Sequence, residues 1–207
     1  LGDVYKRQYV IKSGLALDID NKGLIDRFRE RVMFPIHSFS GRILGFGGRA
    51  LNPNAKAKYQ NSPESLIYNK SKILYGIYFA KNEISKKDNC FIVEGYTDVI
   101  SLHQKGIENV VSASGTSLTI DQIKLINRFT KNITILFDGD AAGLRAAIRG
   151  IDLVLEESMN VRICSFPEGE DPDSYITQYG KSGLAALFKE GMDIVEYLFS
   201  HMKTLYP

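Results

Sequence analysis

The sequence has only two cysteines, three histidines and no long apolar run among its 207 residues. Cys90 and Cys164 each lie in an apolar, strand-like run, so we expect two buried free thiols in a reducing compartment and no disulfide framework. His37, His103 and His201 are far apart and have no cysteine at ligand spacing, so we expect no zinc site. No stretch approaches the ~20 apolar residues of a membrane span, and no secretory signal is visible. We therefore expect neither membrane insertion nor secretion.

The two ends of the sequence suggest a piece of a longer protein. It lacks an initiator methionine and stops at Tyr206-Pro207 with no obvious terminal cap, so we interpret it as a fragment. The first eight residues, Leu1 to Gln8, resemble the translated adapter sequence that occurs in short-read assemblies. We predict that they are artefactual, and they are excluded from the fold prediction.

What the sequence does contain is typical of a globular protein, with 44% hydrophobic and 24% charged residues. Its net charge of +2 conceals an asymmetry, because residues 1–85 carry a net charge of +7 and residues 86–207 a net charge of −5. A basic half beside an acidic half suits a polyanion bound to one part and metal ions bound to the other. A solvated basic face without a ligand remains an alternative on charge alone.

The first half of the sequence predicts a hairpin within a polar surrounding. Apolar residues at 32–36 and 42–46 flank a turn at Ser38 to Gly41. A short helical stretch is predicted at Leu24 to Phe28, a polar loop at 52–66 and a helix at Leu74 to Ile84.

From residue 90 onward, strands and helices are predicted to alternate. Helices are expected at 99–103, before the glycine stop at Gly106, and at Asp140 to Glu157. Another is expected at Thr119 to Thr130, where Thr119 and Gln122 match a capping box. The four predicted strands are Cys90 to Val93, Val110-Val111, Ile133 to Phe137 and Val161 to Phe166. This alternation predicts an α/β fold whose mostly parallel sheet has helices on both faces, followed by a helical segment from Pro172 to Pro207.

Three acidic clusters follow predicted strands. They are Glu94 to Asp98, Asp138-Gly139-Asp140 and Asp171-Pro172-Asp173. The carboxyl ends of parallel strands meet at one edge, so these carboxylates would converge there if the strands are neighbours. A fold tolerates such crowding mainly when divalent metal ions neutralise the charge, and magnesium sites of this kind handle phosphates.

Each acidic cluster alone has another reading. Asp138 and Asp140 also fit a phosphatase, a glycosyltransferase or a helix cap. Asp171-Pro172-Asp173 fits a helix N-cap with proline in the first turn. The three together, on successive strand–helix units, favour a metal site.

The order of several motifs resembles a known family. Glu94 to Asp98 followed by Asp138 to Asp140 resembles the Toprim domain shared by primases, topoisomerases and some nucleases. Four further motifs resemble, more specifically, those of bacterial DNA primase of the DnaG type. They are Phe34-Pro35-Ile36, Gly45 to Arg49, Lys58 to Glu64 and Leu74-Tyr75-Gly76. The resemblance extends over roughly residues 24–205.

The resemblance implies three parts of a primase RNA polymerase core. Residues 1–86 would be a truncated N-terminal α/β subdomain, 87–168 the Toprim metal-binding domain and 169–207 the start of a C-terminal helical subdomain. The family's zinc-binding module would precede this chain and its helicase-binding module would follow it, so we expect no zinc in this fragment.

The resemblance also implies roles for particular residues. Glu94, Asp138 and Asp140 would be the catalytic metal ligands, while Asp98, Asp171 and Asp173 would support a second metal or its water shell. The metal would be Mg²⁺, with Mn²⁺ as a substitute. Contacts to template or nucleotide would come from Arg31, Arg49, Lys58, Tyr59, Asn61 and Lys70. An arginine in a strand can equally pair with an acid at the edge of the core.

The resemblance implies a cytoplasmic enzyme that belongs to the primosome. It would use NTPs to synthesise short RNA primers on single-stranded DNA during replication, by two-metal nucleotidyl transfer. The replicative helicase would bind through a module absent here, and the fragment is expected to be inactive alone if its missing upstream part is needed. Alternatives are another Toprim enzyme, a topoisomerase or nuclease, and a non-catalytic DNA-binding fragment.

Overall fold

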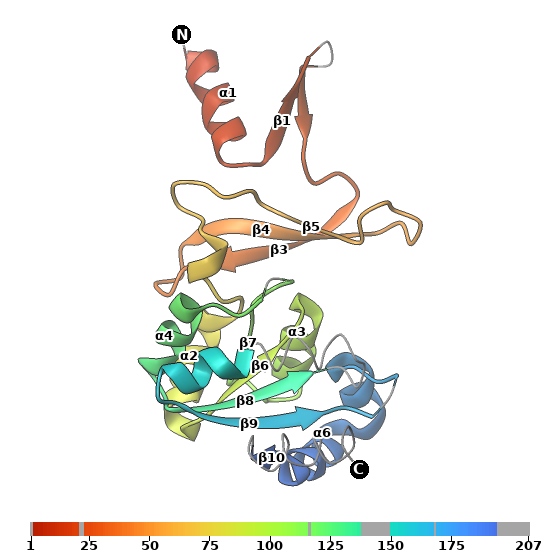
Figure 1. The fold of residues 1–207 in the computed structure, drawn as a ribbon. Helices are drawn as coiled ribbons and strands as arrows, with labels where there is room; N and C mark the ends of the chain where they lie inside the picture. The colour runs from red at the N-terminus through yellow and green to blue at the C-terminus, as the bar shows by residue number, and fades with distance from the viewer. Residues whose placement is uncertain (1, 21–22, 116, 138–149, 168, 194–207) are drawn as a thin grey trace, which may run out of the picture. The chain divides into compact units, whose positions relative to one another are not determined.

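The computed structural model describes residues 2–20, 23–115, 117–137, 150–167 and 169–193. The chain forms two compact units, unit 1 over Leu1–Lys70 and unit 2 over Ser71–Pro207. A short 3-10 helix, η1 (Lys70–Lys72), lies at this division. Figure 1 labels the helices and strands of both units. The sequence predicted subdomain boundaries at 86/87 and 168/169, and these boundaries stay predictions.

Unit 1 begins with a helix and a hairpin. Helix α1 (Gly2–Lys12) precedes strand β1 (Ala16–Ile19), which pairs antiparallel with β2 (Gly23–Asp26). The helix predicted at Leu24 to Phe28 is therefore wrong, because Leu24 and Ile25 pair with Asp18 and Leu17 across the hairpin. Most of the first eight residues belong to α1. Their artefactual origin stays a prediction.

The rest of unit 1 is a three-stranded antiparallel sheet. Strand β3 (Arg31–His37) pairs with β4 (Ile43–Ala50), and β4 pairs with β5 (Tyr59–Asn61). The predicted hairpin is confirmed. Its turn is closed by a bond from the Ser38 amide to the Arg42 carbonyl at 2.7 Å. Strand β5 lies inside the predicted polar loop at 52–66, because three residues of that loop pair with β4.

Unit 2 is built on a five-stranded sheet in the order β10-β9-β8-β6-β7. Its parallel part consists of β6 (Cys90–Val93), β7 (Val110–Ser112), β8 (Asn132–Phe137) and β9 (Asn160–Ser165). All four predicted strands are confirmed, and every observed end lies within one residue of the predicted end. The continuous apolar runs that predicted them are explained by burial on both faces.

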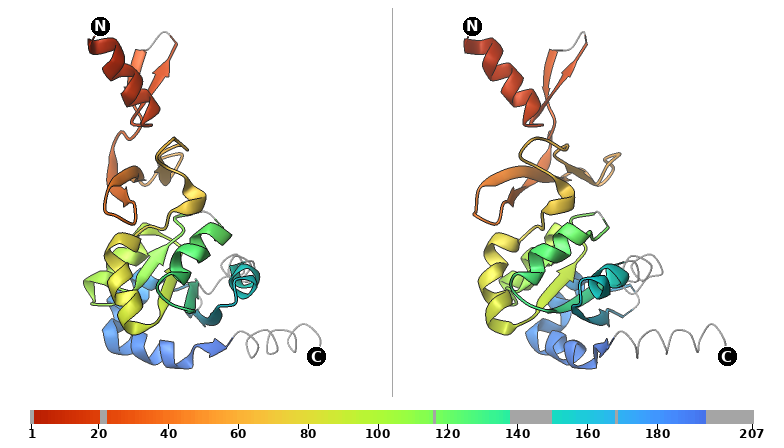
Figure 2. Two further views of the ribbon diagram at one scale, coloured as in Figure 1. Left: turned by 90° about the vertical axis from the view of Figure 1, so that its left-hand side faces the viewer. Right: turned by 60° about the vertical axis from the view of Figure 1, so that its left-hand side comes forward.

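Helices cover both faces of this sheet, as Figures 1 and 2 show. One core lies between the sheet and α2 (Ile77–Lys87), α4 (Ile120–Asn127) and helical residues 150–156. The other core lies between the sheet and α3 (Tyr96–Gln104) and α6 (Pro172–Glu190). The predicted fold class, α/β with a mostly parallel sheet between helices, is confirmed.

Local capping signals set the helix ends. Thr119 Oγ1 accepts from the Gln122 amide at 3.2 Å and Gln122 Oε1 accepts from the Thr119 amide at 3.1 Å, which confirms the predicted capping box. Gly106, with φ +77°, follows α3 as predicted. Most of the helix predicted at 140–157 lies outside the described residues.

The segment after β9 departs from the prediction. Helix α6 is kinked at Gly180, which has φ +62°. It is followed by strand β10 (Met192–Asp193), antiparallel to β9, where helix had been predicted. Pairing with the open edge of β9 overrides the helical pattern there. In the described part of the chain, no helix is long and apolar enough to cross a membrane.

Candidate metal centre and nucleic-acid surface

The strands that precede the three acidic clusters are neighbours. Strand β8 lies between β6 and β9 and is parallel to both, so the carboxyl ends of all three strands meet at one edge. Glu94 follows β6 directly, and α6 begins after β9 at Pro172. The adjacency on which the predicted metal site depends is therefore present. Asp138 and Asp140, after β8, lie outside the described residues.

Glu94 and Asp98 occupy the bend between β6 and α3. Glu94 is exposed and its backbone carbonyl accepts a hydrogen bond from Ser112 Oγ at 2.6 Å. Asp98 is only 7% exposed, and its Oδ2 accepts from the Gly95 amide at 2.8 Å. Asp98 thus stabilises the positive N-terminal end of α3, where a carboxylate is favoured. A metal-supporting role for Asp98 stays a prediction beside this structural one.

Asp171 and Asp173 lie at the start of α6. Asp171 is the N-cap, with Oδ1 accepting from the Ser174 amide at 2.7 Å, and Pro172 follows it in the first turn. This is the capping alternative that the sequence left open. Asp173 Oδ1 accepts a hydrogen bond from Ser101 Oγ on α3. Asp173 is thereby held against the helix that follows Glu94.

The donor chemistry of this edge fits a hard divalent cation, because carboxylate oxygens are the ligands that Mg²⁺ prefers. Among the residues that the structure describes, no three histidine, cysteine, aspartate or glutamate side chains lie close enough together to hold a metal ion. A set of three or more protein ligands at this edge would therefore have to include a residue outside those described, such as Asp138 or Asp140. The metal ligands stay a proposal.

In unit 1, Arg31 has a structural role. Its guanidinium donates to the carbonyls of Gly48 at 3.1 Å, Lys58 at 3.3 Å and Ala57 at 3.0 Å. These bonds fasten the loop before β5 to the β3–β4 hairpin. Neither a phosphate contact nor the acidic partner considered from the sequence is needed to explain this arginine.

Arg49, Tyr59 and Asn61 share one face of the unit 1 sheet. Arg49 and Tyr59 are cross-strand partners, and Asn61 lies two residues further along β5, opposite Gly47. The Arg49 guanidinium carbon lies 5.8 Å from the centre of the Tyr59 ring, and Lys58 Nζ lies 6.0 Å from it. Two cations beside a half-exposed aromatic ring form a surface suited to phosphate and base contacts.

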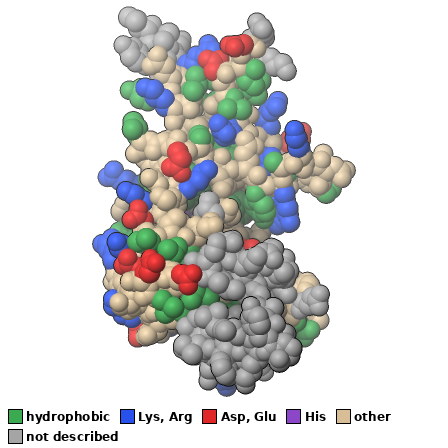
Figure 3. Space-filling model, viewed as in Figure 1, with side chains coloured by type: hydrophobic (Ala, Val, Ile, Leu, Met, Phe, Trp, Pro, Cys, Tyr) green, Lys and Arg blue, Asp and Glu red, His purple; other side chains and the backbone are tan. Residues whose placement is uncertain are grey.

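Lys70 is half-buried at the end of unit 1. Its backbone amide donates to Glu64 Oε1 at 3.0 Å, which orders the turn before η1. Figure 3 shows lysine and arginine side chains on the face of unit 1 that it presents. The sequence-predicted contacts of Lys70 and its neighbours with nucleic acid stay a proposal.

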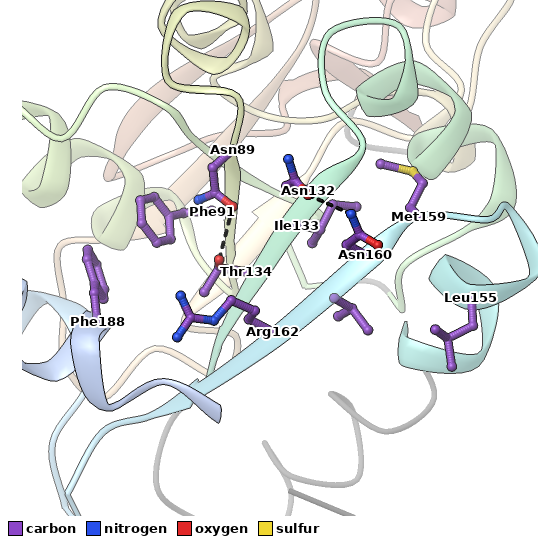
Figure 4. Close-up of a pocket in the computed structure, with 11 residues that line it drawn as sticks. Asn89, Phe91, Asn132, Ile133, Thr134, Leu155, Met159, Asn160, Arg162 and Phe188 are labelled. Carbon is purple, nitrogen blue, oxygen red and sulfur yellow. Dashed lines mark hydrogen bonds between the residues drawn. The ribbon is translucent and has the colours of Figure 1, made fainter. Parts of the chain in front are cut away.

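A pocket of about 620 Å³ lies at the other end of the unit 2 sheet. Its lining includes Asn132 and Asn160, which begin β8 and β9 and are joined by a side-chain hydrogen bond of 2.8 Å (Figure 4). Glu94 and Asp171 follow the opposite, carboxyl ends of β6 and β9. The pocket is therefore separate from the candidate metal centre.

Two site residues were missed from the sequence, Ser112 and Ser101. The Ser101 hydroxyl bonds to the carboxylate of Asp173, 72 residues later, and the Ser112 hydroxyl bonds to the backbone carbonyl of Glu94, 18 residues earlier. The only available signal was position, because Ser112 ends β7, the strand adjacent to β6.

Two family models match successive parts of the chain. The model described as DNA primase catalytic core, N-terminal domain, matches residues 2–81. The model described as Toprim-like matches residues 91–176. The first match begins within the eight N-terminal residues that resemble adapter sequence.

The chain is also similar to individual DNA primases. A DNA primase of Clostridium acetobutylicum is 44% identical over 93% of this chain and 32% of its own length. The solved catalytic core of Escherichia coli primase is 39% identical, with a TM-score of 0.90 over 100% of this chain and 66% of that one. A DnaG primase catalytic domain solved bound to single-stranded DNA is 40% identical, with a TM-score of 0.88 over 95% of this chain and 64% of that one. The chain spans about a third of the length of the curated relatives that it matches.

Proposed function

The chain belongs to the DNA primase family, and we propose that it carries the metal-binding centre of an enzyme that synthesises RNA primers on single-stranded DNA. The observation that carries this proposal is the adjacency of β6, β8 and β9, whose carboxyl ends precede Glu94, the Asp138–Asp140 pair and the Asp171–Asp173 pair. Template-directed synthesis needs charge neutralisation at the phosphates, which divalent metal ions held by carboxylates at this edge of the sheet would supply.

The acidic residues have distinct roles in this proposal. Glu94, Asp138 and Asp140 would hold a divalent metal, Mg²⁺ or Mn²⁺. Asp98 fixes the bend after Glu94, and Asp173 joins α6 to α3 beside it. Two ions held there would supply Lewis-acid activation of a primer 3′-hydroxyl and charge stabilisation of the leaving pyrophosphate.

The basic and aromatic face of unit 1 would bind the nucleic acid. Arg49 and Lys58 supply positive charge beside Tyr59, which can stack on a base. Asn61 lies on the same face and can donate to a sugar or phosphate oxygen. NTPs and a single-stranded template are the proposed partners. A replicative helicase would bind through a part of the complete protein outside this chain.

Family membership favours this proposal over a topoisomerase, a nuclease or a non-catalytic DNA-binding protein. The test uses the complete protein that contains this chain, with Mg²⁺, NTPs and a single-stranded template. We expect primers from the wild type and none from Glu94→Gln or Asp138→Asn, with DNA binding retained by both variants.

Three results would point elsewhere. Nicking of DNA without nucleotide incorporation would support the topoisomerase or nuclease alternative. Template binding without any synthesis by the wild type would support the non-catalytic alternative. Synthesis that persists in Asp138→Asn would remove Asp138 from the metal centre.

A further inference from the structure

The peptide that joins Glu94 to Gly95 is held at both ends by side chains. Its carbonyl accepts from Ser112 Oγ at 2.6 Å, and its amide donates to Asp98 Oδ2 at 2.8 Å. Both groups lie beyond Val93, the last residue of β6. Because a peptide is planar, fixing both ends sets the backbone angles on either side of it. The direction in which the Glu94 side chain leaves the backbone is fixed in the same way.

Ser112 has its hydrogen-bonding groups engaged. It is fully buried, and its hydroxyl accepts from the Ser114 amide at 2.8 Å. A hydroxyl carries a single proton, and the Ser114 amide can only donate, so the Ser112 proton is directed at the Glu94 carbonyl. The Ser112 amide donates to the Tyr75 carbonyl at 3.0 Å and the Ser112 carbonyl accepts from the Tyr75 amide at 2.8 Å.

Tyr75 belongs to the segment 71–76, where the chain enters unit 2. This segment touches the Glu94–Gly95 bend from a second side, because the Tyr75 ring packs edge-on against Tyr96 at 4.7 Å between ring centres. Gly76 lets it approach β7 closely. A Cβ on Gly76 would lie 3.1 Å from the Val110 carbonyl oxygen and 3.0 Å from Val99, and its φ of +87° disfavours other residues.

We propose that Ser112 is a positioning residue that couples the orientation of Glu94 to the seating of segment 71–76 on β7. The inference rests on the proposed function in one respect, that Glu94 is a metal ligand. When the Tyr75 backbone pairs with Ser112, the end of β7 is held in place and the Ser112 hydroxyl donates to the Glu94 carbonyl. When segment 71–76 is displaced, this pairing is lost, and the Glu94–Gly95 peptide loses one of its two side-chain contacts.

The test measures Mn²⁺ binding to the 207-residue chain by electron paramagnetic resonance. Ser112→Ala removes the hydroxyl and keeps the backbone pairing with Tyr75. We expect its Mn²⁺ dissociation constant to rise about tenfold, as is typical when a group that orients a metal ligand is removed. The control is Thr134→Val, which removes a buried hydroxyl bonded to Asn89 at 3.1 Å at the far end of the sheet. It should leave Mn²⁺ affinity unchanged.

A second variant tests the coupling to segment 71–76. Gly76→Ala should weaken Mn²⁺ binding in the same direction, because the added methyl group displaces the segment from β7. Combined with Ser112→Ala it should add little, since both changes disrupt one pathway. Full additivity of the two effects would overturn the coupling.

The remaining outcomes separate this inference from the proposed function. Wild-type Mn²⁺ affinity in Ser112→Ala would overturn the positioning role. Unchanged Mn²⁺ binding in Glu94→Gln would overturn it too, because Glu94 would not be a ligand. If the wild type binds Mn²⁺ through Glu94 and the complete protein makes no primer, the primase proposal fails and the positioning role of Ser112 stands.

Discussion

The hydroxyl of Ser101 on α3 donates a hydrogen bond to Oδ1 of Asp173 in the first turn of α6. Ser101 lies one helical turn beyond Asp98 on α3. The bond therefore joins the helix that carries Asp98 to the helix that begins at the third acidic cluster, although these clusters are more than 70 residues apart in sequence. The half-buried position of both side chains makes the contact more than a surface pairing. Asp173 therefore has a structural partner in addition to its proposed support of a metal.

Two substitutions separate the roles of Asp173. Asp173→Asn keeps an oxygen that can accept from Ser101 and removes the charge, so stability should change little while Mn²⁺ affinity falls. Asp173→Ala should also lower the free energy of unfolding by about 1 kcal/mol, the usual net value of such a hydrogen bond. Urea denaturation and Mn²⁺ titration measure the two effects. Equal Mn²⁺ affinity in the wild type and Asp173→Asn would confine this residue to the helix contact.

Lys58→Ala should weaken binding of single-stranded DNA by the complete protein and lower its salt dependence. Each phosphate neutralised by a lysine adds about 0.7 to the slope of log affinity against log salt for single strands. The matched control is Lys56→Ala, a nearby exposed lysine in the same loop that the proposal does not use. The measurement is fluorescence anisotropy at several salt concentrations. An identical slope for Lys58→Ala and wild type would contradict the contact.

Arg31→Ala should destabilise unit 1 by about 2 kcal/mol, because its guanidinium bonds to three carbonyls across a loop. Arg42→Ala is the control, since Arg42 is an exposed arginine in the hairpin turn. Proteolysis at 51–58 should accelerate in Arg31→Ala alone. If Arg31→Ala instead lowers DNA affinity with unchanged stability, the phosphate role predicted from the sequence regains support.

The stability of unit 2 should depend on the protonation of His103. Burial lowers the pKa of His103, against smaller opposing effects of the Val110 carbonyl and Glu108. The unfolded state then binds more protons than the folded state, so stability is complete above the unfolded pKa of about 6.5 and falls as the pH drops below it. His103→Gln should flatten this part of the pH profile. A profile identical to that of the wild type would show that other groups account for the acid sensitivity.

The parallel sheet of unit 2 could be predicted because its signals are local. Cys90 to Val93 is a short apolar run that burial on both faces requires, and the Thr119–Gln122 capping box depends on residues three positions apart. The strands that were missed or misassigned are short. Leu24 pairs with Asp18 in a hairpin of two four-residue strands, and Met192 pairs with Ile163, a partner far back in the sequence that no local pattern specifies.

The candidate site shows the same limit. Spacing and strand order predicted that the acidic clusters share an edge. The helix cap that Asp171 forms through the Ser174 amide was one of the alternatives that the sequence offered. Sequence did not reveal that the Arg31 guanidinium is engaged by carbonyls of residues 48, 57 and 58. These contacts depend on where loops fold back, which is set by tertiary structure.

Both edges of the parallel sheet in unit 2 are closed by backbone that runs in the opposite direction. Tyr75 pairs with Ser112 on the outer side of β7, and Met192–Asp193 pairs with β9. An open edge strand is a template for pairing with a second molecule, and two short reversed segments are enough to block it. Tyr75, whose backbone pairs with Ser112 beside Glu94, thereby also leaves less of β7 open to a second molecule.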